Sequence, residues 1–311
     1  MDQRRFSLLS RLWLKEVDEA TLAELEALPD LAGQVTSSKE LAISYTEAFL
    51  LNVYPYASVF LDLNGEMNGL RSRELSALYV QSGYQPESLY EAGAPDHMGL
   101  VLGLLAHLPG SIHASVLSKY VLDWAPVLCL SIERQPSVHP FYRALAASTR
   151  RVLFQAFEGE DLAAQPPSAS QRLLADSGHV EDGWIELPLA EPGEELSLSQ
   201  VIHYLLCPAR SGIFLSRAQL GQLASRMGVP QAFGERYRLG ISLFEAAGMV
   251  DQVPELLEQL LSELGAWDAA YVAWAEEFPV WGLFAGEWRE RIATARILLE
   301  KARFSLQTTP L

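Results

Sequence analysis

Apolar residues recur at intervals of three and four along most of the chain, and the period-two alternation typical of half-buried strands is nearly absent. This pattern predicts an all-α fold. The helices that it predicts before residue 158 are an amphipathic first helix at the N-terminus, 37–51 opened by a Ser37–Glu40 capping box, 71–81 ending at Gly83, 96–108, 111–132 with a kink near Pro126, and 136–157.

The segment 93–100 marks a break between two helical blocks. Pro95 disfavours helix at the residue before it. Asp96 is a favourable N-cap, because its carboxylate accepts the N–H groups of a new turn. The apolar run that follows through Leu108 indicates a buried helix. Taken alone, this pattern is typical of a helix start, and it places an Asp96–His97 pair at the break.

The composition changes at Glu158. Between residues 158 and 196 there are ten acidic residues and one basic residue, together with prolines at 166, 167, 188 and 192. Segments of this kind usually form surface linkers, although 184–187 is also compatible with one short strand. We therefore expect a domain over 1–157, an acidic linker over 158–196, and a second helical domain over 197–311.

Four tryptophans recur every seven residues in the C-terminal part, at 267, 274, 281 and 288. Seven residues return to nearly the same face of a helix, while Pro279 and Gly282 predict a break midway. The favoured interpretation is an aromatic core seam, and the alternative is a surface on which a cofactor or peptide stacks.

Charge and cysteine content exclude several classes of function. The chain has 311 residues and a formal net charge of −16, which disfavours binding to nucleic acid or to an anionic membrane surface. Two cysteines, Cys129 and Cys207, form no disulfide framework and suit a reducing compartment. No stretch approaches 18 uncharged apolar residues, so we expect no membrane span and a cytoplasmic protein.

An Arg4–Arg5 pair near the N-terminus resembles a twin-arginine export signal. Arg11 interrupts the apolar run after it, and no small-residue cleavage site follows. We therefore interpret this region as an amphipathic helix of the fold.

The motifs of common enzyme classes are absent from the sequence. It has no phosphate-binding loop, no Gly-x-Gly-x-x-Gly, no Gly-x-Ser-x-Gly, no His-Glu-x-x-His and no Cys-x-x-Cys. Asp96–His97 has no nucleophile nearby in sequence, and Cys207 beside Arg210 is more typical of a loop between helices than of a reactive thiol. We expect no catalytic activity, no metal and no cofactor.

Several motifs together indicate a family. Residues 41 to about 157 resemble the TorD/DmsD/NarJ family of cytoplasmic chaperones for molybdoenzymes. The matching pieces, in order, are the segment 45–58 with Tyr54–Pro55, Tyr79 with Gly83, Pro95–Asp96–His97, Leu122–Asp123–Trp124–Ala125–Pro126, and Phe141–Tyr142 with Ala146. The sequence departs from the family where Gly93–Ala94 replaces a frequent glutamate, and the resemblance does not extend past about residue 197.

The resemblance implies an all-helical TorD-like bundle whose Pro-Asp-His segment links two helical blocks. It implies a partner, namely the N-terminal leader or the apo form of a molybdenum-cofactor oxidoreductase. Carried over by position, Pro95, Asp96 and His97 belong to the leader-binding or hinge region, and Tyr54 and Trp124 match further motif positions. Asp96 is then expected to pair with an arginine of the leader.

Two other functions remain open. One is a helical interaction scaffold that keeps this fold without a molybdoenzyme client, which the additional C-terminal domain favours. The other is an enzyme that uses Asp96, His97 or Cys207, which requires those side chains to meet a third catalytic group in one pocket.

Overall fold

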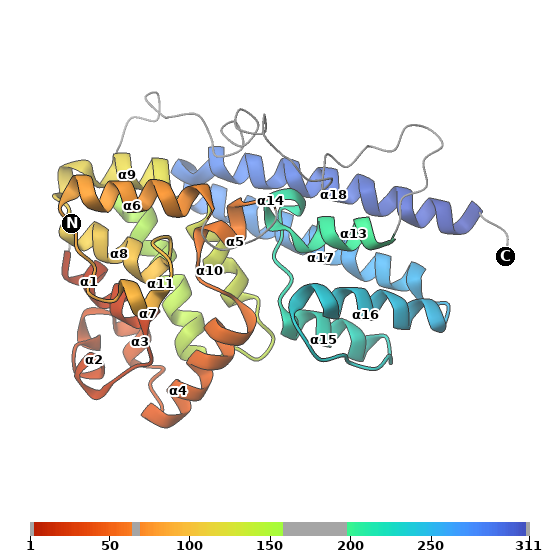
Figure 1. The fold of residues 1–311 in the computed structure, drawn as a ribbon, viewed down its shortest axis with the longest axis horizontal. Coiled ribbons are helices and arrows are strands. Elements are labelled where there is room, and N and C mark those ends of the chain that lie inside the picture. Colours follow the sequence, from red (N-terminus) through yellow and green to blue (C-terminus); the bar gives the residue numbers. More distant parts are fainter. Residues whose placement is uncertain (1–2, 64–68, 158–197, 309–311) are drawn as a thin grey trace. The chain divides into compact units, whose positions relative to one another are not determined.

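The computed structural model describes residues 3–63, 69–157 and 198–308 (Figure 1). The chain divides into two compact units, Met1–Pro166 and Pro167–Leu311. Within the described ranges the regular elements are helices, which confirms the all-α prediction. The acidic linker predicted over 158–196 and the short strand considered at 184–187 lie outside the described residues.

The N-terminal unit is built from short helices. Its elements are α1 Gln3–Leu14, α2 Glu19–Ala23, η1 Leu25–Ala27, α3 Pro29–Ala32, α4 Ser38–Tyr45, the π-helix η2 Thr46–Asn52, α5 Ala57–Leu61, α6 Leu70–Ser82, α7 Leu89–Ala92, α8 Met98–His107, η3 Gly110–Ile112, α9 His113–Tyr120, α10 Ala125–Glu133 and α11 Pro140–Phe157.

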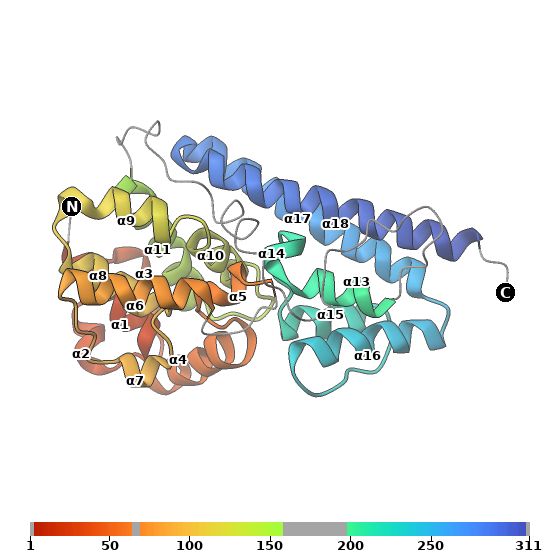
Figure 2. The same cartoon turned by 45° about the horizontal axis from the view of Figure 1, so that its top comes forward.

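Helix α1 packs against α8 in this unit (Figures 1 and 2). The two backbones approach closely at Gly99, where an added Cβ would lie 2.8 Å from the carbonyl oxygen of Ser10. The Ser10 hydroxyl donates a 2.6 Å hydrogen bond to the carbonyl oxygen of Gly99. The apolar face of α1 is buried, which confirms an amphipathic first helix and not an exposed apolar signal segment.

Three of the sequence-predicted helices have clearly different bounds in the structure. The helix predicted over 136–157 begins only at Pro140, as α11. The helix predicted over 111–132 is divided into α9 and α10, because the chain leaves the helix at 121–124. Pro126 therefore lies in the first turn of α10, where a proline is tolerated, and produces no kink. The helix predicted over 37–51 begins as expected, with the Ser37 hydroxyl accepting from the Glu40 N–H at 3.2 Å, but continues from Thr46 as a π-helix.

The C-terminal unit pairs two long helices with a group of shorter ones. Helices α17 (Val253–Glu277) and α18 (Gly282–Thr308) lie side by side (Figure 2). The short 3-10 helix η6 (Pro279–Trp281) connects them in the chain. The other elements are α13 Leu198–Leu206, α14 Pro208–Ser211, α15 Arg217–Arg226 and α16 Arg236–Met249. The break predicted between Pro279 and Gly282 is confirmed.

The four tryptophans form part of the core of this unit. Each is at most 8% exposed. Tyr271 contacts three of them, with ring centroids 5.8 Å from Trp267, 5.7 Å from Trp281 and 6.4 Å from Trp288, and Trp274 contacts Trp281 at 5.9 Å. Its hydroxyl donates to the carbonyl oxygen of Gly212 at 2.8 Å. The core-seam interpretation is therefore confirmed.

Candidate functional site

Two segments far apart in the sequence meet at the Pro95–His97 turn. The Ala57 N–H donates to the carbonyl oxygen of Asp96 at 3.1 Å, and the Met98 N–H donates to the carbonyl oxygen of Pro55 at 2.8 Å. Residues 56 and 97 thereby form an isolated antiparallel bridge. We call residues 53–58 and 94–98 together the corner. It joins two of the motif segments identified in the sequence.

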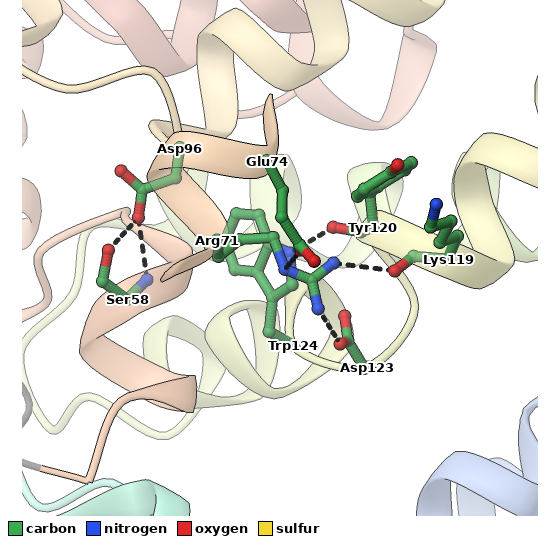
Figure 3. A network of polar contacts seen from close by, with 8 residues as sticks. All are labelled: Ser58, Arg71, Glu74, Asp96, Lys119, Tyr120, Asp123 and Trp124. Carbon is green, nitrogen blue, oxygen red and sulfur yellow. Dashed lines mark hydrogen bonds and ion pairs between the residues drawn. The ribbon is translucent and has the colours of Figure 1, made fainter. Parts of the chain in front are cut away.

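Asp96 holds the corner from inside. Its side chain is 0% exposed, and its Oδ2 accepts the Ser58 N–H at 2.8 Å and the Ser58 hydroxyl (Figure 3). Ser58 lies in the first turn of α5, so this carboxylate satisfies an N–H group at the start of that helix. Among the described residues, Oδ1 of Asp96 has no hydrogen-bond partner. An arginine from outside can reach it only if the corner opens.

His97, and not Asp96, is the N-cap of α8. Its Nδ1 accepts the Gly99 N–H at 3.1 Å. The prediction that Asp96 caps this helix is wrong, because the Asp96 carboxylate is directed to Ser58. Burial lowers the pKa of His97 to about 3. The imidazole is therefore neutral at neutral pH and can accept the bond.

Two tyrosine hydroxyls fix the chain that leads into the turn. Tyr79, on α6, donates to the carbonyl oxygen of Pro95 at 2.5 Å, and Tyr56 donates to the carbonyl oxygen of Ala92 at 2.7 Å. Burial raises the pKa of both phenols, and the nearby Asp96 charge acts in the same direction. Both hydroxyls thus remain protonated donors.

A second polar cluster surrounds Arg71 in α6. Its Nη2 lies 2.6 Å from Oδ2 of Asp123, and its Nη1 donates to the carbonyl oxygen of Lys119 at 2.8 Å (Figure 3). The Nε of Arg71 lies 3.4 Å from Oε2 of Glu74. The side chains of Arg71 and Asp123 are only 4% and 6% exposed, so the ion pair is buried. This pair therefore ties α6 to the turn between α9 and α10.

Trp124 belongs to this second cluster. It is 0% exposed, and its indole N–H donates to the carbonyl oxygen of Tyr120 at 2.8 Å. Sequence reasoning did not single out Arg71, because one arginine at the start of a helix has no sequence signal that separates a buried position from an exposed one. Asp123 belongs to the Leu122–Pro126 motif, but the sequence does not reveal that Arg71 is its ion-pair partner.

The five sequence-predicted site residues therefore differ in what they offer at the surface. Asp96, His97 and Trp124 are buried, Pro95 is half-buried, and Tyr54 is 41% exposed. The corner brings Tyr54, Pro95, Asp96 and His97 into one region, whereas Trp124 lies with Arg71. Their role in peptide binding stays a prediction.

Residues 14–129 match the family model described as nitrate reductase delta subunit. The matched range contains the whole corner and the Arg71–Asp123 pair. The resemblance expected over residues 41–157 is thus confirmed over 41–129, whereas the match begins earlier, at residue 14, and ends before the Phe141–Tyr142 motif. This family is one of chaperones for molybdoenzyme maturation and not of catalysts. No curated protein and no solved structure matches the chain.

The delta-subunit match ends before α11 and does not include the C-terminal unit. The residue of that unit that the sequence analysis considered as a possible reactive thiol is Cys207. Burial raises the pKa of the Cys207 thiol, and the nearby Arg210 opposes this shift without reversing it. The thiol is buried beside the short helix α14. This environment is typical of a structural cysteine and not of a nucleophile.

Neither a metal cluster nor a membrane-spanning helix is found in the parts of the chain that the structure describes. These residues contain no group of three or more His, Cys, Asp or Glu side chains placed to hold a metal ion. No single helix among them is long and apolar enough to cross a membrane. The pair 110–120 and 125–133 passes that length-and-composition test only when taken together, across a 73° bend.

Proposed function

We propose that this protein is a cytoplasmic chaperone that binds the N-terminal leader or the apo form of a molybdenum-cofactor oxidoreductase and assists its maturation. The observation that carries the proposal is the delta-subunit match over residues 14–129. The protein acts by binding and carries out no chemistry. Its partner is a polypeptide, and no nucleic acid and no membrane span take part.

The corner is the proposed centre of the client-binding region. Tyr54 and Pro95 reach the surface there and contact the client. Asp96 and His97 act from beneath, because their hydrogen bonds to Ser58 and Gly99 fix the two loops that present Tyr54 and Pro95. Trp124 acts at a distance from the corner, because it precedes α10 and α10 packs against α5.

The charge of the protein suits a basic client segment. Residues 1–157 contain 17 acidic and 12 basic residues, and the whole chain carries −16. A field of this sign attracts a leader rich in arginine and accelerates its association. The attraction weakens as salt is added, because exposed charges are screened.

A helical scaffold with another client is the second candidate. The observation that favours it is the C-terminal unit, which lies outside the delta-subunit match. Recovery of partners unrelated to cofactor enzymes in a pull-down with the full chain would select this alternative.

Calorimetric titration of the full chain tests the proposed function. The ligand is a synthetic peptide of the leader of a molybdenum-cofactor oxidoreductase encoded beside this gene. We expect a dissociation constant of about 1 µM or lower at low salt, which corresponds to about −8 kcal/mol, and weaker binding at higher salt. A matched peptide with its arginines replaced by glutamine is the control. Absence of binding to both the leader and the apoenzyme would refute the function.

A further inference from the structure

The helix formed by α4 and η2 exposes an apolar face. Its outward side chains are Ile43, Leu50, Leu51 and Tyr54, which are 55%, 53%, 43% and 41% exposed. Ile43 lies on α4, Leu50 and Leu51 lie on η2, and Tyr54 follows two residues after η2 ends at Asn52. A surface helix normally presents polar residues on its outer side, and clustered exposed apolar residues mark interaction sites.

The opposite face of the same helix is already used by the core. Tyr45 and Phe49 are buried, with ring centroids 5.0 Å apart, and Phe49 meets Trp13 of α1 at 4.9 Å. The Tyr45 hydroxyl donates to the carbonyl oxygen of Trp13 at 3.0 Å. Rotation of the helix to hide Leu50 and Leu51 would break this packing, so the exposed face is fixed.

The backbone beneath the exposed leucines is irregular. Thr46–Asn52 is a π-helix, and the Val53 N–H donates to the carbonyl oxygen of Ala48 at 2.9 Å, five residues back. Such segments are rare and are frequent at functional sites. This one ends at Asn52, two residues before Tyr54, which is the most exposed of the sequence-predicted site residues.

Two carboxylates lie on the same face, toward the start of the helix. Glu40 and Glu47 are exposed and lie three residues before and four residues after Ile43. The Glu40 side chain is 58% exposed, and its Oε1 is 3.9 Å from Nε2 of His139. Lys39, four residues before Ile43, is also exposed, so two acidic side chains and one basic side chain surround Ile43, with a net negative charge, and the surface from Leu50 to Tyr54 is apolar.

We propose that this acidic and apolar face of α4 and η2 is the docking surface for the client leader. The occupant is a segment in which basic residues adjoin an apolar run, and this assignment rests on the proposed function. The basic residues lie over Glu40 and Glu47, and the apolar run lies over Leu50, Leu51 and Tyr54, toward the corner. The carboxylates thus set the direction in which the leader binds.

Two kinds of variant of the full chain test this surface. The first is the double variant Leu50→Ser, Leu51→Ser, and the second is Glu47→Lys. Matched controls of the same chemistry elsewhere on the N-terminal unit are Val80→Ser, at a side chain 82% exposed on α6, and Glu87→Lys, at an exposed glutamate. The probe is a synthetic peptide with an arginine pair followed by a run of leucine and alanine, measured by calorimetry at low and high salt.

We expect the double serine variant to weaken binding by about tenfold or more at both salt concentrations, because it removes apolar contact area. Glu47→Lys should weaken binding several-fold at low salt, with the difference lost at high salt. A peptide with glutamine in place of arginine should not distinguish Glu47→Lys from the wild type. The controls should bind as the wild type does.

Other outcomes separate this inference from the proposed function. Wild-type affinity in both the double serine variant and Glu47→Lys would overturn the surface and leave client binding in place. An effect of Glu87→Lys equal to that of Glu47→Lys would overturn the directional pairing. A wild-type chain that binds no such peptide and no apoenzyme overturns both.

Discussion

Asp123→Ala is expected to lower the free energy of unfolding of the N-terminal unit by about 3–5 kcal/mol. The reason is that the substitution leaves the Arg71 guanidinium buried without the carboxylate that lies 2.6 Å from it. Removal of one partner of a buried ion pair costs more than the pair contributes, because the remaining charge stays out of water. Urea unfolding followed by circular dichroism measures the change.

The matched control is Asp30→Ala, which breaks a pair of similar length at the surface. Arg151 lies 2.5 Å from Asp30, and their side chains are 50% and 57% exposed. Solvent screens this pair, so its loss should cost less than about 1 kcal/mol. Equal destabilisation in the two variants would contradict the structural role of the Arg71–Asp123 pair.

Asp96→Ala is expected to lower the free energy of unfolding by about 1–3 kcal/mol, because it leaves the buried Ser58 N–H and hydroxyl without their acceptor. Asp96→Asn keeps an acceptor oxygen at the same place and should lose less. The measurement is urea unfolding of both variants beside the wild type. Unchanged stability of Asp96→Ala would show that this carboxylate does not hold the corner.

Asp96→Ala also distinguishes a direct contact between Asp96 and the leader from an indirect, positioning role. The sequence-based expectation is that Asp96 pairs with an arginine of the leader, so that Asp96→Ala weakens leader binding directly. In the structure the side chain is buried beneath the corner. A loss of affinity that accompanies a loss of stability therefore indicates a positioning role, whereas a loss of affinity at full stability indicates a direct contact.

The sequence predicted the helices well where apolar spacing and local caps agreed. Gly83, in the left-handed region at a φ of 69°, ends α6 as expected. The sequence did not predict the division of 111–132, because the run is apolar on both sides of the turn at 121–124 and the break depends on tertiary contacts. One such contact is the bond from Arg71 to the carbonyl oxygen of Lys119.

The corner shows the limit of local reasoning most clearly. Pro95 correctly marked the break, and the family motifs correctly selected both segments that meet there. Which of Asp96 and His97 caps α8 depends on Ser58, which lies 38 residues earlier in the chain. Sequence spacing carries no information on the contact between Asp96 and Ser58. From the sequence alone the cap is therefore assigned to Asp96, because aspartate has the higher intrinsic preference for the N-cap position.

The exposed apolar face of α4 and η2 also lay beyond sequence reasoning. The spacing of four residues places Leu41, Tyr45 and Phe49 on one helix face, and the structure buries that face. It did not reveal that Ile43, Leu50 and Leu51 remain outside, because a helix with apolar residues on both sides usually lies deep in a core. The structure distinguishes the two faces by burial.

Hydrogen exchange of the full chain, with and without the leader peptide of the proposed molybdenum-enzyme client, tests the central claim most directly. The claim is that the family-matched N-terminal unit receives the client beside the corner. We predict slower exchange on binding at residues 38–58 and 94–98, and unchanged exchange in α17 and α18. Protection confined to the C-terminal unit would contradict the claim.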